Sequence, residues 1–440
     1  MSWPYHPDLL ATPVPRYTSY PTAAEFHDGV GAPDLDAALA AVPDEAGVSL
    51  YIHIPYCEEI CWYCGCNTGA ANRAHRLASY LEALEAEIER VAGRLGGRGR
   101  VRRIAFGGGS PNAIPPEDFL RLVARLRGLF AAGDALLSVE LDPRTLTPQW
   151  LAALGEARVA RASLGVQTLA PKVQQAIGRV QPEAAIRAAV EGLRAAGIAS
   201  LNVDLMYGLP HQGTAELAAT LEAVRAMAPE RIALFGYAHV PHLVPRQRRI
   251  DAAALPGLPE RFAQAAFGHR FFTDAGYVPV GFDHFALPDD PLAAAAQAGR
   301  LRRNFQGYTD DDASILIGLG ASAISQFPGL LVQNEKNVGR YRMLVSSGRL
   351  AGARGTLRSD EDRRRGAVIE ALLCRLEADA AALPWQEARA RLRPFEERGL
   401  VAWHGTRLRI TEAGRPYART VAATFDAWRT PESRPFSNAV

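Results

Sequence analysis

Three cysteines on one short segment carry the most distinctive chemistry of this chain. Cys57, Cys61 and Cys64 follow a strand-like run with the spacing C-x3-C-x2-C. Three thiolates are one fewer than a closed tetrahedral metal site or a fully protein-ligated [4Fe-4S] cluster requires, so one metal position is left open for a small molecule. Two alternatives stand beside this interpretation: a zinc site with Cys66 as the fourth ligand, and ordinary buried thiols.

Glycines and polar residues stand at the ends of five further predicted strands. They are the glycine run at 107–111, Glu140, Gln167, Asp204 and the run at 237–239. Three consecutive glycines lack Cβ atoms, so backbone can approach a bound ligand closely there. Because the carboxyl ends of parallel strands are where sites assemble in α/β folds, we expect these features to form one site with the cysteine loop.

A repeated unit of strand and helix would position these residues. Strands are predicted at residues 48–54, 101–106, 136–141, 161–166, 201–206 and 231–237, with helices at 117–130, 148–157, 182–196 and 213–227. Between the first two strands, apolar residues from Leu77 to Leu95 recur at steps of four and three, which is typical of one stripe of a helix. Alternating elements predict a parallel sheet with helices outside, either a barrel or a doubly wound sheet.

Composition predicts a globular cytoplasmic protein. The chain has 440 residues, of which 48% are hydrophobic and 22% are charged, and its net charge of +2 draws it to neither nucleic acid nor anionic lipid. The start lacks a signal peptide, and no run of 18 apolar residues occurs. Five cysteines, four of them within ten residues, favour a reducing compartment over a disulfide framework. We expect no nucleic-acid or membrane partner, and a monomer.

The cysteine spacing, with an aromatic residue just before the third cysteine, resembles that of the radical S-adenosylmethionine (SAM) family. The resemblance implies an α/β fold built on a partial (β/α)6 barrel. It also implies a [4Fe-4S] cluster whose ligands are Cys57, Cys61 and Cys64 and whose unligated iron binds the amino and carboxylate groups of SAM. In that family, an electron from the cluster splits SAM to give a 5'-deoxyadenosyl radical.

The resemblance further implies two SAM molecules near the cluster. The positions that match the cluster-bound SAM are Tyr51, Gly108, Glu140 and Ile324. The positions that match the second SAM are Tyr63, Gly109, Ser110, Gln167, Arg179, Asp204 and Ala238. Cys66 matches a cysteine that is not a cluster ligand, and we expect it to act beside the cluster, with a packed thiol as the alternative. His53 is expected to handle a proton near the cofactors, with a core histidine as the alternative.

Two further motifs narrow the resemblance to the branch of the family that acts on porphyrinogens. These motifs are the octet at 15–22 and the loop at 304–309. The branch implies that two propionate side chains of coproporphyrinogen III are decarboxylated to vinyl groups, giving protoporphyrinogen IX and two CO2, while two SAM become methionine and 5'-deoxyadenosine. An external reductant and an electron acceptor, neither identified, are also implied.

Four carboxylates on such a substrate need cationic partners, and arginine can hold a carboxylate with two hydrogen bonds. Arg16, in the N-terminal octet, is the first candidate because this segment is expected to cover the site, and Gln306 and Tyr308 follow. Asp310, Asp311 and Asp312 depart from the pattern of this branch, in which neutral residues are usual at these positions. They would therefore place carboxylates near an anionic substrate. A related haem-binding member, either a haem chaperone or a haem-modifying enzyme, is the alternative function.

Three domains are predicted. Residues 1–45 form a segment covering the active site, residues 46–354 form the barrel and its extension, and residues 355–440 form a smaller helical, winged-helix-like domain. Ser359, with Asp362 three residues later, predicts a helix start, and residues 399–410 predict a hairpin.

Overall fold

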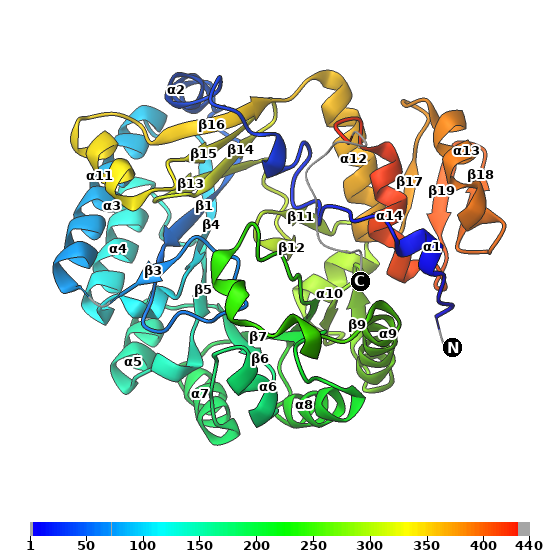
Figure 1. Cartoon of the computed structure of the whole chain (residues 1–440). Helices are drawn as coiled ribbons and strands as arrows, with labels where there is room; N and C mark the ends of the chain where they lie inside the picture. Colours follow the sequence, from blue (N-terminus) through cyan, green and yellow to red (C-terminus); the bar gives the residue numbers. More distant parts are fainter. Residues whose placement is uncertain (1–2, 72, 430–440) are drawn as a thin grey trace.

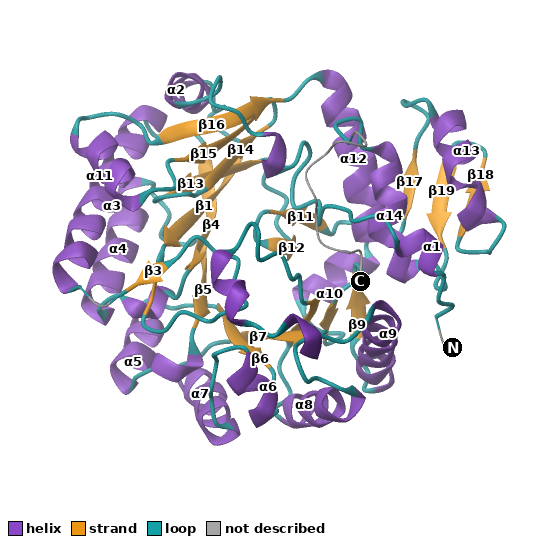
Figure 2. Ribbon diagram, in the orientation of Figure 1, coloured by secondary structure: helices purple, strands orange, loops and turns teal. Residues whose placement is uncertain are grey.

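The computed structural model describes residues 3–71 and 73–429 of the chain. Within them, the largest sheet has twelve strands, is open and mixed, and curves around the centre of the molecule with helices on its outer face (Figures 1 and 2). This is the partial barrel that the sequence predicts, and its edge strands do not pair to close it.

The six strands predicted from the sequence all form, each within two residues of the predicted bounds. They are β1 (Gly47–Ile54), β4 (Arg100–Gly108), β5 (Leu136–Leu141), β6 (Arg161–Gln167), β7 (Ser200–Tyr207) and β8 (Arg231–Gly236). Each pairs in parallel with the next. Their carboxyl ends therefore meet at one edge of the sheet.

Helices follow these strands and cover the outer face. They are α3 (Ala74–Leu95), α4 (Pro116–Leu129), α5 (Pro148–Glu156), α6 (Pro171–Ala176), α7 (Glu183–Ala195) and α8 (Thr214–Ala226). The sequence predicts all of them except the short α6. The apolar stripe of α3 is buried along its whole length, from Leu77 to Leu95. No helix in the described part of the chain has both the length and the apolar character that a membrane crossing needs.

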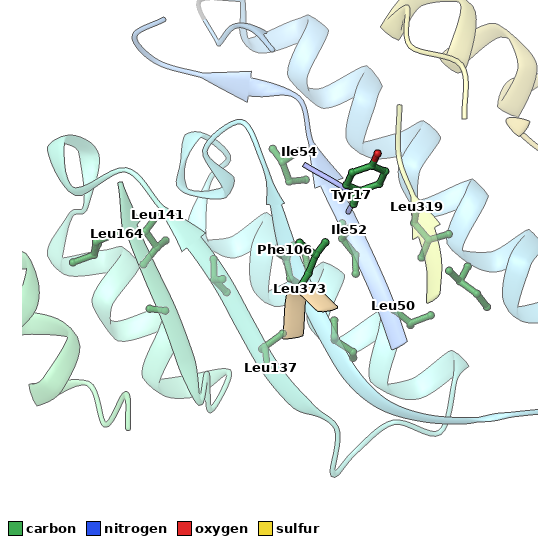
Figure 3. Close-up of a cluster of buried hydrophobic side chains, with 14 of the residues drawn as sticks. Tyr17, Leu50, Ile52, Ile54, Phe106, Leu137, Leu141, Leu164, Leu319 and Leu373 are labelled. Atoms are coloured by element: carbon green, nitrogen blue, oxygen red, sulfur yellow. The ribbon is translucent and has the colours of Figure 1, made fainter. Parts of the chain in front are cut away.

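Side chains alternate between the two faces of the parallel strands. In β5, Leu137, Val139 and Leu141 are buried in the main core, whereas Ser138 and Glu140 line the central cavity. β6 and β7 alternate in the same way. Figure 3 shows apolar side chains that β1, β4, β5 and β6 contribute to this core. The period of two thus separates apolar packing from the polar interior.

Further strands extend the sheet at both edges, and the sequence did not predict them. They are β13 (Ile315–Leu319), β14 (Ile324–Phe327), β15 (Leu330–Asn334) and β16 (Gly352–Leu357) beside β1, and β10 (His284–Ala286) and β9 (Val278–Val280) beside β8. β13 runs parallel to β1, and the others pair antiparallel. These strands are short, and fully buried short apolar runs such as β13 are ambiguous between strand and helix.

The remaining helices of the barrel and a small hairpin complete this part of the chain. The helices are α9 (Leu258–Asp274), α10 (Pro291–Gln297) and α11 (Val338–Ser346), and the hairpin joins β11 (Arg302–Asn304) to β12 (Gly307–Thr309). Figure 1 shows the hairpin inside the curve of the sheet.

The N-terminal segment contains α1 (Pro7–Leu10) and α2 (Ala32–Ala40), and it forms hydrogen bonds with residues of the C-terminal part of the chain. The Tyr17 hydroxyl donates to Asp426 at 2.9 Å, and the Arg419 guanidinium donates to the Val14 carbonyl at 2.5 Å. The His27 N–H donates to the Gly355 carbonyl at 2.9 Å. The segment is therefore fixed in place by contacts far along the chain.

The C-terminal module contains the predicted helices and hairpin. Its elements are α12 (Asp360–Arg375), β17 (Glu377–Asp379), α13 (Trp385–Glu396), β18 (Val401–His404), β19 (Arg407–Ile410) and α14 (Ala418–Ala422). Ser359 caps α12 with Asp362 in a capping box, as predicted. The module packs against the β9–β12 region, where the Tyr308 hydroxyl donates to the Leu373 carbonyl. The three domain boundaries stay predictions, and residues 1–2 and 430–440 lie outside the described residues.

A buried carboxylate joins α3 to the added strands. Glu87 is 1% exposed and accepts hydrogen bonds from the Gly320 N–H, the Asn334 amide and the Tyr341 hydroxyl, at 2.6–2.8 Å. On the same helix, the Tyr80 hydroxyl donates to the His53 carbonyl at 2.6 Å. α3 therefore fixes both the end of β1 and the turn after β13. Burial raises the pKa of Glu87 to about 6.

We expect Glu87→Gln to change how stability depends on pH. Because the folded pKa lies above the ordinary value of 4.5, the folded protein binds this proton more tightly, and Glu87 lowers the free energy of unfolding by about 2 kcal/mol as pH rises from 4.5 to 6. Glutamine does not titrate, so the variant should gain that amount relative to the parent between pH 4 and pH 7 in urea unfolding. Glu82→Gln, an exposed position on the same helix, is the control; an equal pH effect in both variants would contradict the assignment.

Candidate active site

The cysteine loop follows the carboxyl end of β1, and its two ends pair with each other. Cys57 ends β2 (Tyr56–Cys57), which pairs with β3 (Gly69–Ala70). The Trp62 N–H donates to the Ile177 carbonyl at 3.0 Å, and so attaches the loop to the turn after α6. Two backbone anchors therefore hold the segment that carries Cys61 and Cys64.

Hydrogen-bond donors surround the three sulfurs. The Ser110 hydroxyl lies 3.6 Å from Cys57 Sγ, and the Cys66 N–H lies 3.4 Å from Cys64 Sγ. Hydrogen bonding from Cys66 lowers the pKa of Cys64 to about 6, whereas burial raises the pKa of Cys57. Donors aimed at sulfur stabilise thiolate, which is the form that binds iron.

Two arginines bring positive charge to Cys61. Arg179 Nη1 lies 3.2 Å from Cys61 Sγ, and Arg144 Nη2 lies 3.6 Å from it. Both guanidinium groups also bond Asp142, at 3.1 Å from Arg179 and 2.6 Å from Arg144. Arg179 and Asp142 are each 5% exposed, and Arg179 further donates to the Gly165 carbonyl on β6. This network joins the cysteine loop to the ends of β5 and β6.

The donor set fits a three-thiolate cluster better than a single ion. Among residues 3–71 and 73–429, no three His, Cys, Asp or Glu side chains converge closely enough to hold one metal ion. An iron–sulfur cluster binds each thiolate through a different iron, so its ligands need not converge on a single point. Cys66 is exposed, as a thiol outside the ligand set can be. Cys57, Cys61 and Cys64 are therefore the residues that would hold the cluster.

The glycine run lies tightly against β1. Gly108 has φ of 107°, and a Cβ there would lie 2.4 Å from the His53 ring. A Cβ on Gly109 would lie 2.3 Å from the Tyr56 carbonyl oxygen. The Gly109 and Ser110 N–H groups instead donate to the Ile54 and Tyr56 carbonyls, at 2.8 and 2.7 Å. Only glycine permits this approach.

Glu140 lies beside this run. Its Oε2 accepts from the Gly108 N–H at 3.2 Å, and burial raises the pKa of Glu140 to about 7. Tyr51 lies near Glu140, and burial together with this carboxylate raises the pKa of the tyrosine. Tyr51 pairs across the sheet with Gly318, where a Cβ would lie 2.6 Å from the Ile324 oxygen. The structure thus brings Tyr51, Gly108, Glu140 and Ile324 into one region, and their SAM-binding roles stay predictions.

His53 lies on β1, and its ring faces Gly108. Its 7% exposed ring lies 3.4 Å from the Tyr51 hydroxyl and 3.4 Å from the Asn67 carbonyl. Burial lowers the pKa of His53 to about 4, so the ring is neutral near pH 7. A neutral imidazole can still accept or donate one proton.

The positions expected for the second SAM continue around the strand ends. Gln167 ends β6 with φ of 66°, and Asp204 on β7 accepts from Ser163 at 3.0 Å and Asn202 at 2.8 Å. Burial raises the pKa of Asp204. Arg179 and Ser110, which are also expected at the second SAM, contact the cysteine sulfurs instead: Arg179 contacts Cys61 and Ser110 contacts Cys57.

One residue that the sequence did not nominate joins the loop to the end of β8. Gln247, in the short helix Pro245–Arg249, donates to the Tyr63 carbonyl at 2.8 Å and to the Ala238 carbonyl at 3.1 Å. It is 2% exposed. The sequence also did not nominate Arg144 and Asp142, which hold the cysteine loop in place. Asp142 lies two residues after Glu140, which the sequence nominates, whereas nothing in the sequence singles out Gln247 or Arg144.

The substrate candidates are distributed over two cavities. Gln306 and Tyr308 line a central cavity of about 350 Å³ together with Glu140 and Asp204. Gln306 is exposed, whereas the Tyr308 hydroxyl is used in its bond to Leu373. Arg16 lines a second cavity and donates to the Gly236 carbonyl, at the end of β8, at 2.7 Å.

Asp310, Asp311 and Asp312 do not lie at the carboxyl ends of the strands. Asp310 pairs with Arg103 at 2.9 Å and with Arg161 at 2.7 Å, near the starts of β4 and β6. Asp311 pairs with Arg103 and accepts from Ser49, and Asp312 is exposed. Asp311 nevertheless lines the central cavity together with Gln306 and Tyr308, and Arg103 offsets its charge there. The effect of the three aspartates on substrate choice stays a prediction.

Comparisons with known proteins agree with this geometry. Residues 51–224 match the model of the radical SAM superfamily. The chain is 43% identical to the oxygen-independent coproporphyrinogen III oxidase of Bradyrhizobium diazoefficiens, over 97% of each protein, and 38% identical to that of Pseudomonas aeruginosa, over 94% and 93%. The solved structure of coproporphyrinogen III oxidase from Escherichia coli, a radical SAM enzyme, superposes with a TM-score of 0.91 at 35% identity, covering 98% of this chain and all of that one. The chain belongs to the oxygen-independent coproporphyrinogen III oxidase family of the radical SAM superfamily.

Proposed function

We propose that this protein decarboxylates two propionate side chains of coproporphyrinogen III to vinyl groups without oxygen. The products are protoporphyrinogen IX and two CO2, with two SAM converted to methionine and 5'-deoxyadenosine. The observation that carries this proposal is the three-cysteine loop held at the strand ends beside Glu140 and the glycine run. Identity over nearly the full length of named relatives supports the choice of substrate.

In this reaction, the residues of the chain would bind and orient the cluster and SAM and would shield them from water. When bound, the cluster and SAM supply a carbon radical that removes one hydrogen atom from the propionate carbon next to the ring. The propionate then loses CO2 and one electron, which leaves the vinyl group, so an external electron acceptor is required for balance. Cys57, Cys61 and Cys64 would hold the cluster, and the glycine run and Glu140 would seat SAM. The N-terminal segment contributes Trp3 and Arg16 to the lining of the cavity beside β8 and would limit the access of water.

Several properties follow from this proposal. The cluster needs an external one-electron donor, and this donor and the final acceptor are not identified. We place the enzyme in the cytoplasm, supported by the reduced thiols that the cluster requires. We also expect it to be a monomer. Two SAM molecules and three cysteine ligands are part of the proposal.

The function is tested by anaerobic turnover of the reconstituted enzyme. Coproporphyrinogen III, SAM and a chemical reductant should yield protoporphyrinogen IX and about two 5'-deoxyadenosine per product, measured by chromatography. Tight haem binding without vinyl products would instead favour the haem-binding alternative.

Alanine substitutions should separate ligand cysteines from Cys66. Cys61→Ala removes one of three thiolates, so we expect loss of the brown cluster and of SAM cleavage together, read from iron content and visible absorption. Cys66→Ala should keep the cluster, because its thiol is not a ligand. Cluster loss in Cys66→Ala, or one bound zinc in the parent, would favour the four-cysteine zinc site.

SAM binding should depend on the charge of Glu140. Because burial raises its pKa to about 7, the carboxylate is mostly protonated at pH 6 and accepts hydrogen bonds from SAM only weakly. We expect the Kd for SAM to fall about tenfold from pH 6 to pH 8 in the cluster-loaded enzyme. Glu140→Gln should bind weakly at both pH values, as measured by equilibrium dialysis; a parental pH dependence in this variant would exclude Glu140 as its source.

A further inference from the structure

His284 lines the central cavity and is held in place by the preceding aspartate. It begins β10, where it pairs with Ala233 of β8 across the sheet. Its Nδ1 lies 2.6 Å from Oδ1 of Asp283, and its side chain is 12% exposed. Asp283 in turn lines the smaller cavity beside β8. The two residues therefore form a hydrogen-bonded pair between the two cavities.

Two aromatic rings fix the orientation of the His284 imidazole. Its ring centroid lies 5.3 Å from that of Phe235 and 5.0 Å from that of Tyr308, at interplanar angles of 80° and 86°. Both neighbours also line the central cavity. The ring atom nearest to where a Cβ on Gly307 would lie is Nε2, at 3.9 Å. Nε2 therefore points toward the hairpin at 304–309, whose residues line the same cavity.

The charge of Asp283 decides which nitrogen of the ring carries the proton. Burial opposes ionisation, but the His284 ring and the guanidinium groups of Arg303 and Arg16 hold the pKa of this carboxyl group below its usual range. An ionised carboxylate has no proton to donate, so Nδ1 must donate to it. In the neutral imidazole, Nε2 then carries a lone pair and accepts a hydrogen bond.

A ligand that fits this nitrogen carries a hydrogen-bond donor into the central cavity. The volume of about 350 Å³ falls within the range of small-molecule sites. The lining arginines Arg103, Arg161 and Arg231 are already paired with aspartates. A porphyrinogen carries four pyrrole N–H groups, and its saturated bridging carbons let these groups point to one face of the macrocycle. Its core therefore supplies the donors that Nε2 lacks in an apolar or purely anionic ligand.

We propose that Nε2 of His284 accepts a hydrogen bond from a pyrrole N–H of the porphyrinogen, and that Asp283 positions the ring for this contact. The proposal rests on the proposed function. In the oxidised, planar porphyrin, the N–H groups lie in the plane of the ring and point to its centre, where Nε2 does not reach them. His284 therefore distinguishes the substrate from its oxidised form, although both carry the same four carboxylates.

The test compares two ligands that share their carboxylates and differ in their N–H groups. Coproporphyrinogen III and coproporphyrin III are dialysed separately against the anaerobic, cluster-loaded enzyme with SAM at pH 8, without an electron donor for the cluster, so that no turnover occurs. His284→Phe should raise the Kd for coproporphyrinogen III about tenfold, because one hydrogen bond is lost, and should change the Kd for coproporphyrin III less than twofold.

Two further variants serve as controls for this measurement. His284→Gln has an amide that can donate to Asp283 and accept from the pyrrole, so its Kd for coproporphyrinogen III should fall between those of the parent and His284→Phe. His75→Phe changes an exposed histidine on α3 and should bind both ligands like the parent.

A double-mutant cycle tests the positioning role of Asp283. Asp283→Asn should raise the Kd for coproporphyrinogen III about threefold or more when His284 is present, and less than twofold in the His284→Phe background, because the carboxylate acts only through the ring. An equal effect in both backgrounds would show that Asp283 has a structural role and would overturn its positioning role.

The two ligands also separate the failure of this inference from failure of the proposed function. An unchanged Kd for coproporphyrinogen III in His284→Phe, or an equal rise for both ligands, would overturn the contact between Nε2 and the pyrrole. If the parent itself does not bind coproporphyrinogen III, the proposed function fails, and the inference fails with it.

Discussion

The contact of Arg179 with both Cys61 and Asp142 connects the reactive loop to the rigid sheet. Asp142 follows β5, Arg179 also bonds the Gly165 carbonyl on β6, and the guanidinium reaches the sulfur at 3.2 Å. All three charged or polarisable groups are buried, so solvent screens their interaction little. A loop without regular structure is thereby fixed to two parallel strands, as a cluster that must face its cofactor requires.

The alternation of side chains along the strands explains why this site can exist inside the sheet. Leucine, isoleucine and valine side chains on one face of the strands form the core beneath the helices, and Figure 3 labels several of the leucines and isoleucines. The other face is left free for polar groups. Glu140 on β5 and Asp204 on β7 both face the central cavity, and burial raises the pKa of both. The same packing that stabilises the sheet therefore tunes the groups expected to hold SAM.

The sequence predicts the repeated part of the fold well and the added parts poorly. Long amphipathic helices between β-branched runs define β1 and β4 to β8, whereas short runs such as β13 have no period that separates strand from helix. The cysteines and glycines were found because their types and spacing are unusual. Gln247 was not, since a glutamine gains its role only when folding brings the carbonyls of Tyr63 and Ala238 within reach of one amide.

Charged residues near the starts of the parallel strands are paired with one another. Near the strand starts, Arg103 and Arg161 are paired with Asp310, and Arg231 is paired with Asp290 at 2.7 Å. Each of these arginines has a carboxylate partner within the protein, and all three line the central cavity. This pairing accounts for the carboxylates of Asp310 and Asp311 in a protein whose proposed substrate is itself an anion.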